Sequence, residues 1–142
     1  MLELSATQDE LREHVARFAG TEIEPNARVW DEGEAFPRSI FSKLGELGWL
    51  GVGIGEAFGG SGGGPVERCI LIEELARASA AVTLGVYVHA VLASGALAVV
   101  AGPDLAHRHL PPLLAGERIG AWAYAEPGGR CRRPPGAPAR PS

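Results

Sequence analysis

Few residues of this 142-residue chain have the chemistry of a functional site: four histidines, two cysteines and a scatter of carboxylates. His89 is the most notable of them, because it lies in an apolar stretch, residues 78–103, that carries no formal charge. A histidine on an apolar helix is commonly a core residue with one hydrogen-bond partner. Buried polar groups on apolar walls also mark binding pockets. His89 therefore has two interpretations, a core histidine or a pocket-lining residue.

The other candidate residues do not form a catalytic or metal-binding set. His107 and His109 are two residues apart, so on a helix they point in different directions. Cys69 and Cys131 form no C-x-x-C pair, and Cys69 lies in an apolar helical pattern, which predicts an inert thiol on the core face. Glu73 and Glu74 follow one another in the sequence, so their side chains do not share a helix face. The residues therefore assign no catalytic group and no metal site.

Residues 49–65 contain eight glycines and raise the question of a phosphate cradle. A P-loop needs the pattern G-x-x-x-x-G-K-[ST], and the only lysine of the chain is Lys43, ahead of the glycines. No strand–helix–strand unit of a dinucleotide fold surrounds them either. We therefore predict a surface loop whose glycines adopt positive φ.

Charge is distributed unevenly along the chain. Residues 1–129 carry seventeen acidic and nine basic residues, whereas residues 130–142 carry four arginines and no acid. The body thus lacks a basic surface for nucleic acid, and no nucleic-acid partner is predicted. The N-terminal sequence lacks the pattern of a secretory signal, and two unpaired cysteines suit a reducing compartment, so the expected location is cytoplasmic.

Hydrophobic periodicity with proline and glycine boundaries predicts five to six helices. Thr7 and Glu10 fit a capping box, and Gly20 is expected to end the helix that follows. Further helices are expected after Pro25, between Pro37 and Gly48, from Pro65, over residues 78–103, and from Pro103 to the pair Pro111–Pro112.

The stretch 78–103 is long enough to span a membrane, which needs about 20 apolar residues. It is rich in Ala, Gly, Ser and Thr, however, and amphipathic helices precede and follow it. A helix that is apolar on all sides is buried in protein or in lipid. We predict a central core helix and no membrane span, with a membrane helix as the alternative.

Residues 118–126 alternate between two faces, which is typical of a β-strand. A single strand has no pairing partner and is not stable alone. The predicted fold class is therefore all-α, a bundle of five to six helices followed by one incomplete β-strand and a disordered tail. The predicted boundaries are 1–117 for the helical domain, 118–129 for the strand and turn, and 130–142 for a disordered basic Pro/Arg-rich tail. This tail is interpreted either as a basic disordered arm or, as we favour, as the product of a shifted reading frame in a GC-rich gene, since arginine outnumbers lysine twelve to one in the chain.

Four motifs in order, LGELGWLGVGIGEAFGG, IEELARASAAV, VYVHAVLASGAL and LPPLLAGERIGAWAYAEPG, resemble the acyl-CoA dehydrogenase family at its N-terminal helical domain. The resemblance covers residues 4–129. It implies FAD as cofactor, acyl-CoA as substrate, and α,β-dehydrogenation with the flavin as hydride acceptor. In that family a β-domain and a C-terminal helical bundle follow, and the bundle carries the general base, so no residue of this chain is assigned that role.

The resemblance also implies site residues. The family's flavin motif places Trp122 at the aromatic position, followed by Tyr124 and Ala125, and these three are the implied cofactor-binding residues. Ala125 stands where the family has threonine, so a hydroxyl contact to the flavin is missing while backbone contacts remain. His89 becomes a substrate-binding residue on the wall of the acyl pocket.

Two functions are therefore expected from different classes. The first is a truncated acyl-CoA dehydrogenase-like flavoprotein, inactive alone, that associates with the missing domains or forms a homo-oligomer. The second is a non-catalytic helical interaction module that pairs with another chain, since large unburied apolar patches usually mark interfaces.

Overall fold

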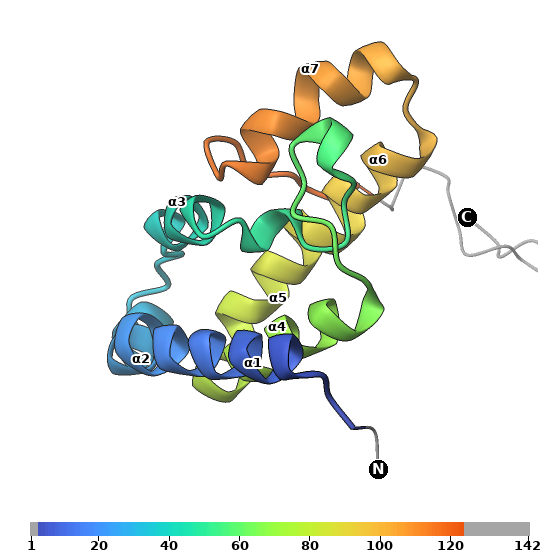
Figure 1. Ribbon diagram of the computed structural model, residues 1–142. Coiled ribbons are helices and arrows are strands. Elements are labelled where there is room, and N and C mark those ends of the chain that lie inside the picture. Colours follow the sequence, from blue (N-terminus) through green and yellow to red (C-terminus); the bar gives the residue numbers. More distant parts are fainter. Residues whose placement is uncertain (1–2, 124–142) are drawn as a thin grey trace, which may run out of the picture.

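Five continuous helical segments build the part of the chain that the computed structural model describes, residues 3–123 (Figure 1). This confirms the predicted all-α class. The segments are α1 (Ala6–Phe18) continuing through the π-helical turn η1 (Ala19–Ile23) into α2 (Glu24–Glu32); α3 (Arg38–Glu46); α4 (Pro65–Ala78); α5 (Ala80–Tyr87) continuing through the π-helical η4 (Val88–Ser94) into α6 (Gly95–Val100); and α7 (Pro103–Leu114). Two short 3₁₀ turns, η2 (Trp49–Gly51) and η3 (Glu56–Phe58), lie between α3 and α4.

The first helix begins earlier and ends later than the sequence pattern predicts. Ser5 is its N-cap: the Ser5 hydroxyl accepts from Gln8 N (3.2 Å), and the Gln8 side chain accepts from Ser5 N (3.0 Å). The capping box predicted at Thr7 and Glu10 is therefore wrong by two residues. Gly20 does not end the helix, because it faces solvent while Ala19 and Ile23 continue the buried stripe.

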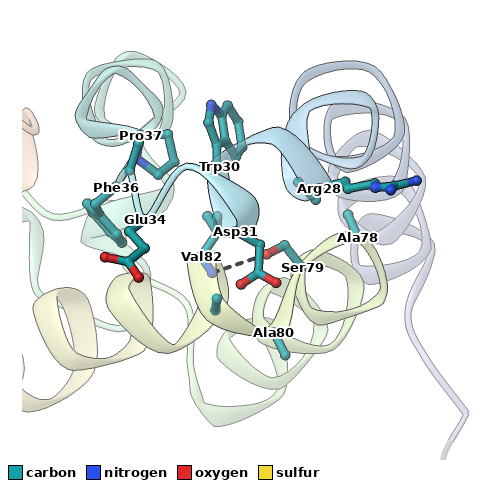
Figure 2. A pocket seen from close by; sticks show the side chains of 13 residues that line it. Arg28, Trp30, Asp31, Glu34, Phe36, Pro37, Ala78, Ser79, Ala80 and Val82 are labelled. Atoms are coloured by element: carbon teal, nitrogen blue, oxygen red, sulfur yellow. Dashed lines mark hydrogen bonds between the residues drawn. The ribbon is translucent and has the colours of Figure 1, made fainter.

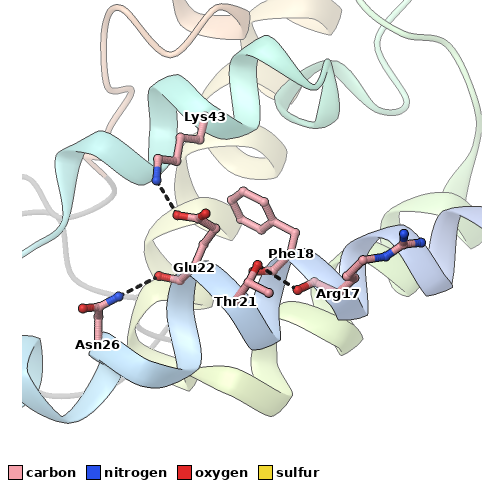
Figure 3. Close-up of polar contacts among 6 residues, drawn as sticks. All are labelled: Arg17, Phe18, Thr21, Glu22, Asn26 and Lys43. Carbon is pink, nitrogen blue, oxygen red and sulfur yellow. Dashed lines mark hydrogen bonds and ion pairs between the residues drawn. The ribbon is translucent and has the colours of Figure 1, made fainter.

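Side chains satisfy backbone groups around the π turn η1 (Figure 3). Thr21 Oγ1 donates to the carbonyl of Arg17 (3.0 Å), and Asn26 Nδ2 donates to the carbonyl of Glu22 (3.2 Å). The Glu22 carboxylate forms an ion pair with Lys43 of α3. This turn therefore joins the first helix to α3, and α3 packs Ile40, Phe41 and Leu44 into the core.

Helix α4 lies against α1 and is tied to it by a polar contact. Gln8 Nε2 donates to one oxygen of Glu67 (2.7 Å), and the other Glu67 oxygen accepts from Gly64 N at the start of α4 (2.7 Å). These bonds lower the pKa of the Glu67 carboxyl, the Gln8 bond most. Cys69 was predicted on the core face and is instead exposed, because Ile70, Leu71 and Leu75 supply the inward stripe.

Two hydrophobic clusters form the interior. The larger one joins the first helix, α3, α4 and α5, with these buried members: Val15, Ala19, Ile23, Ile40, Phe41, Leu44, Leu50, Leu71, Leu75, Val82, Val86 and Ala90. The smaller one holds α7 against the glycine-rich loop, with Ile54, Ala106, Leu110 and Leu114.

The glycine-rich segment, residues 49–65, forms a loop that is held by hydrogen bonds between its own backbone groups. Gly53 N donates to Gly62 O, Gly62 N donates to Ile54 O (3.0 Å), and Val52 and Gly62 form an isolated bridge. Gly53, Gly59, Gly62 and Gly63 all have positive φ. The Arg68 guanidinium donates to the carbonyls of Val52 (3.0 Å) and Gly53 (2.9 Å). The loop therefore binds this cation through its backbone carbonyl oxygens.

Helix α7 runs through both prolines that were predicted to stop it. A proline inside a helix removes one donor but leaves its carbonyl free to accept. Pro111 O accepts from Ala115 N (2.9 Å), and Pro112 O accepts from Arg118 N (3.0 Å). Burial of Leu110 and Leu114 on either side holds the last turn in place.

The segment after α7 does not form a strand in its described part. Residues 119–123 are neither helix nor strand. The rest of the expected strand and the tail at 130–142 lie outside the described residues.

Candidate functional site: the apolar helix and the segment that crosses it

The helix formed by α5, η4 and α6 is the central element of the candidate site. Ser79 caps its start: the hydroxyl accepts from Val82 N (3.3 Å), and the Ser79 carbonyl accepts from Thr83 Oγ1 (2.7 Å). In the described part of the chain this helix, Ala80–Val100, is the one that is long and apolar enough to cross a membrane, with a mean hydropathy of 1.8. It packs only one face inward.

That inward face carries polar groups among its apolar residues. Thr83, His89 and Ser94 are buried beside Val82, Val86 and Ala90. The opposite face remains open among the described residues: Leu84 is 63%, Val99 84% and Val100 80% exposed. The predicted core helix is thus half buried, and its free face is strongly apolar.

His89 lies fully buried in the π-helical stretch and bonds through both ring nitrogens. Gly120 N donates to Nδ1 (2.9 Å), and Nε2 lies 3.1 Å from the carbonyl of Leu113. A carbonyl oxygen can only accept a hydrogen bond, so Nε2 carries the proton and Nδ1 is unprotonated. The Phe41 ring meets the imidazole edge-on, with centroids 5.1 Å apart. Burial lowers the pKa of His89, more than the Leu113 carbonyl raises it, which keeps the ring neutral.

The structure thus places His89 where the core interpretation expects it. Both ring nitrogens of His89 are already hydrogen-bonded to backbone groups among residues 3–123. As a residue on the wall of a substrate pocket, His89 would therefore act through its shape and packing. That role stays a prediction.

The segment after α7 passes very close to this helix at Gly120. A Cβ atom built on Gly120 would lie 2.8 Å from the Cβ of Ala93 and 3.5 Å from His89 Nδ1. Two residues further on, Trp122 is 47% exposed. Tyr124 and Ala125, the other two implied cofactor-binding residues, lie outside the described residues. The structure therefore joins His89 to Gly120, two residues before Trp122, the first of the implied cofactor-binding residues.

Titratable groups elsewhere in residues 3–123 do not form a metal-binding cluster. No three His, Cys, Asp or Glu side chains in this range gather closely enough to hold a metal ion. His107 packs its ring against Phe58, with centroids 5.1 Å apart, and so helps to fix the glycine-rich loop on α7.

A groove at the N-terminal end of the same helix was missed by sequence reasoning (Figure 2). It has a volume of about 760 Å³ and lies between the end of α2 and the junction of α4 with α5. Its wall includes Trp30, Asp31, Glu34 and Phe36. The sequence feature that could have indicated the groove is Gly33-Glu34 just before Phe36-Pro37. Gly33 is the C-cap of α2, and Glu34 turns the chain with a φ of 49°.

This arrangement of helices is that of the acyl-CoA dehydrogenase N-terminal domain. The sequence pattern of the family described as "Acyl-CoA dehydrogenase, N-terminal domain" matches residues 5–117. The chain belongs to this family.

Individual relatives agree with that assignment. The chain is 35% identical over 125 residues to a benzylmalonyl-CoA dehydrogenase of Aromatoleum aromaticum, covering 88% of this chain and 33% of the relative. It is 37% identical over 126 residues to the mitochondrial isovaleryl-CoA dehydrogenase of Pongo abelii, covering 87% and 30%. The solved structure of a putative acyl-CoA dehydrogenase from Mycobacterium smegmatis superposes with a TM-score of 0.81 at 33% identity, covering 89% and 34%. This chain thus spans about a third of the length of these relatives.

Proposed function

We propose that this chain supplies the N-terminal helical domain of an FAD-dependent acyl-CoA dehydrogenase, and that these 142 residues alone do not turn over acyl-CoA. The observation that carries the proposal is the helix Ala80–Val100, with one face in the core and the other open and apolar. In relatives three times as long, further domains are available to cover such a face. An acyl chain and a flavin ring are both apolar enough to lie against it.

The residues near the flavin motif fit the cofactor in part. The exposed indole of Trp122 offers an apolar contact beside the half-buried segment at Gly120. Ala125 has no hydroxyl, so that position would contact the flavin through backbone only. When bound, FAD would accept the hydride from the substrate. This chain would position the ring and exclude water, while the proton would go to a base that we assign to no residue among 3–123.

The proposal includes the environment of the helix. The buried polar groups Thr83, His89 and Ser94 on its inner face suit a protein core rather than lipid, where unpaired polar groups cost more. We therefore propose a cytoplasmic protein in which Ala80–Val100 does not cross a membrane, and which joins further domains or copies of itself.

A chimera tests the domain assignment. Residues 5–117 of this chain replace the matching segment of the Mycobacterium smegmatis relative, and flavin absorbance is followed as isovaleryl-CoA or benzylmalonyl-CoA is added. We expect bound FAD and substrate-dependent bleaching. The full 142-residue chain, given FAD and the same substrates, should show no bleaching. Turnover by the chain alone would overturn the proposed inactivity.

A matched pair of surface variants tests the role of the open face. Leu84→Asp places a charge on that face, and Val29→Asp places one on α2, where exposure is similar at 67%. In the chimera, Leu84→Asp should abolish flavin retention and Val29→Asp should keep it. Equal effects of the two would contradict the proposal.

The second candidate, a non-catalytic interaction module, is favoured by the same open face. Its distinguishing result is a stable complex of the 142-residue chain with a partner that carries no flavin. A well-folded monomer by light scattering that binds no hydrophobic dye would rule it out.

A further inference from the structure

The groove at the start of α5 combines carboxylates with aromatic and proline surface. Asp31 and Glu34 supply the carboxylates, and Trp30, Phe36 and Pro37 supply the apolar wall. In Figure 2 both carboxylates lie on the side of the groove that faces α5. The volume of about 760 Å³ falls within the range of roughly 300–1,000 Å³ typical of ligand pockets.

The carboxylates of Asp31 and Glu34 are available to bind a cationic group. Neither Asp31 nor Glu34 forms an ion pair or a side-chain hydrogen bond with another residue among 3–123, whereas Arg28, the cation on the wall, is paired with Glu32 (2.7 Å). A guanidinium satisfies carboxylates with paired donors and also stacks on aromatic faces. Proline-rich segments dock into aromatic-lined grooves because their extended helix is already formed. The groove thus suits a segment rich in arginine and proline.

The chain itself contains such a segment outside the described residues. Residues 130–142 hold four arginines, four prolines and no acidic residue. They include two overlapping P-x-x-P patterns, which begin at Pro135 and Pro138, with Arg133 before the first and Arg140 within the second. The acidic excess of residues 1–129 favours their approach.

The tail is long enough to reach the groove. Gly120 is bonded to His89, which stands nine residues after Ala80 in the same helix, an axial distance of about 14 Å at 1.5 Å per residue. Arg130 follows Gly120 by ten residues, which span up to about 33 Å when extended. The groove therefore lies within reach without any movement of the helices.

We infer that residues 130–142 dock into the groove between α2 and α5 of the same chain, with arginine guanidinium groups on Asp31 and Glu34. This inference is independent of the proposed dehydrogenase function, because it requires neither flavin nor substrate.

The native thiol of Cys131 gives a direct test in the full chain. In a Cys69→Ser variant a nitroxide is attached to Cys131, and amide signals of the ¹⁵N-labelled protein are compared before and after reduction of the nitroxide. We expect the amides of residues 27–36 and 79–82 to lose more signal than those of α7. At about 1 M salt, where the Debye length is about 3 Å, the loss should be at least halved.

Charge-matched variants show whether the groove carboxylates hold the tail. Asp31→Asn with Glu34→Gln removes the groove charges, and Glu10→Gln with Glu13→Gln removes two exposed charges from α1. The first pair should restore at least half of the lost signal, and the second should restore little. Arg132→Ser with Arg133→Ser, which leaves the described residues unchanged, should act like the first pair.

Three results would overturn the inference. One is an even loss of signal over the surface. Another is an equal effect of the two carboxylate pairs. The third is an undiminished loss when ¹⁵N-labelled protein without thiols is mixed with unlabelled nitroxide-bearing protein, because that result places the tail on a second copy.

Discussion

Gly120 donates its backbone N–H to Nδ1 of His89 over 2.9 Å, and this bond joins the segment after α7 to the middle of the apolar helix. The other ring nitrogen holds the carbonyl of Leu113 at the end of α7. One neutral imidazole therefore fixes two consecutive parts of the chain against the helix. The first three predictions follow from this arrangement.

Replacing His89 by leucine should destabilise the domain strongly. The substitution keeps an apolar side chain but leaves the Leu113 carbonyl and the Gly120 N–H without partners, at about 1–3 kcal/mol for each buried group. We expect the free energy of unfolding to fall by about 2–4 kcal/mol. His14→Leu on the surface of α1 is the control and should change it by less than about 0.5 kcal/mol. Denaturant unfolding followed by circular dichroism measures both.

The stability of the domain should fall as the pH drops below about 6.5, because burial lowers the pKa of folded His89 below its ordinary value of 6.5. The unfolded chain takes up the proton first, so this part of the stability is present above that pH and is lost as the pH falls through the folded pKa. Unfolding free energies between about pH 7.5 and pH 5 should decline more steeply for the natural chain than for His89→Leu. Parallel curves would contradict this.

Gly120→Ala should separate the crossing segment from the helix. The added Cβ would lie 2.8 Å from the Cβ of Ala93, so the backbone must shift, at about 1–3 kcal/mol. Gly55→Ala is the matched control, since it meets nothing within 4 Å and has a φ of −64°. It should be neutral or stabilise by about 0.4–1 kcal/mol through the unfolded chain. Thermal unfolding of the two variants measures the contrast, and Ala93→Gly should partly rescue Gly120→Ala.

Ser94→Ala and Ser79→Ala should have opposite effects. The Ser94 hydroxyl is buried without a hydrogen-bond partner among the described residues, so its removal should leave stability unchanged or raise it by about 1 kcal/mol. The Ser79 hydroxyl caps α5, and its removal should cost about 1 kcal/mol. Chemical denaturation compares the two. A clear loss with Ser94→Ala would indicate a bound water at that hydroxyl.

The helices could be predicted from the sequence because their signals are local. Proline and glycine boundaries located α3 and α4, and the charge-free composition located the helix that contains His89. The ends were less predictable where packing decides. Gly20 and Pro111 both stand at positions where propensity favours a break, but buried neighbours on the next turn keep the helix intact.

The site could be predicted only in part. The polarity of His89 against its surroundings singled it out, but its two backbone partners lie 24 and 31 residues away and no sequence period links them. The prediction placed Cys69 on the buried face of α4, but the adjacent residue Ile70 is buried and Cys69 is exposed. The sequence pattern thus predicted the helix but misjudged its buried face by one residue. The groove around Asp31 was invisible, since its two walls come from segments more than 40 residues apart.

The π turn at Ala19–Ile23 sets the orientation of everything that follows it in the first helix. A π turn holds one residue more than regular α-helix would, and one residue corresponds to a rotation of about 100°. Deleting Gly20 would therefore turn α2 about its own axis, carrying Trp30 and Asp31 away from α5. The groove thus depends on a single inserted position in the first helix.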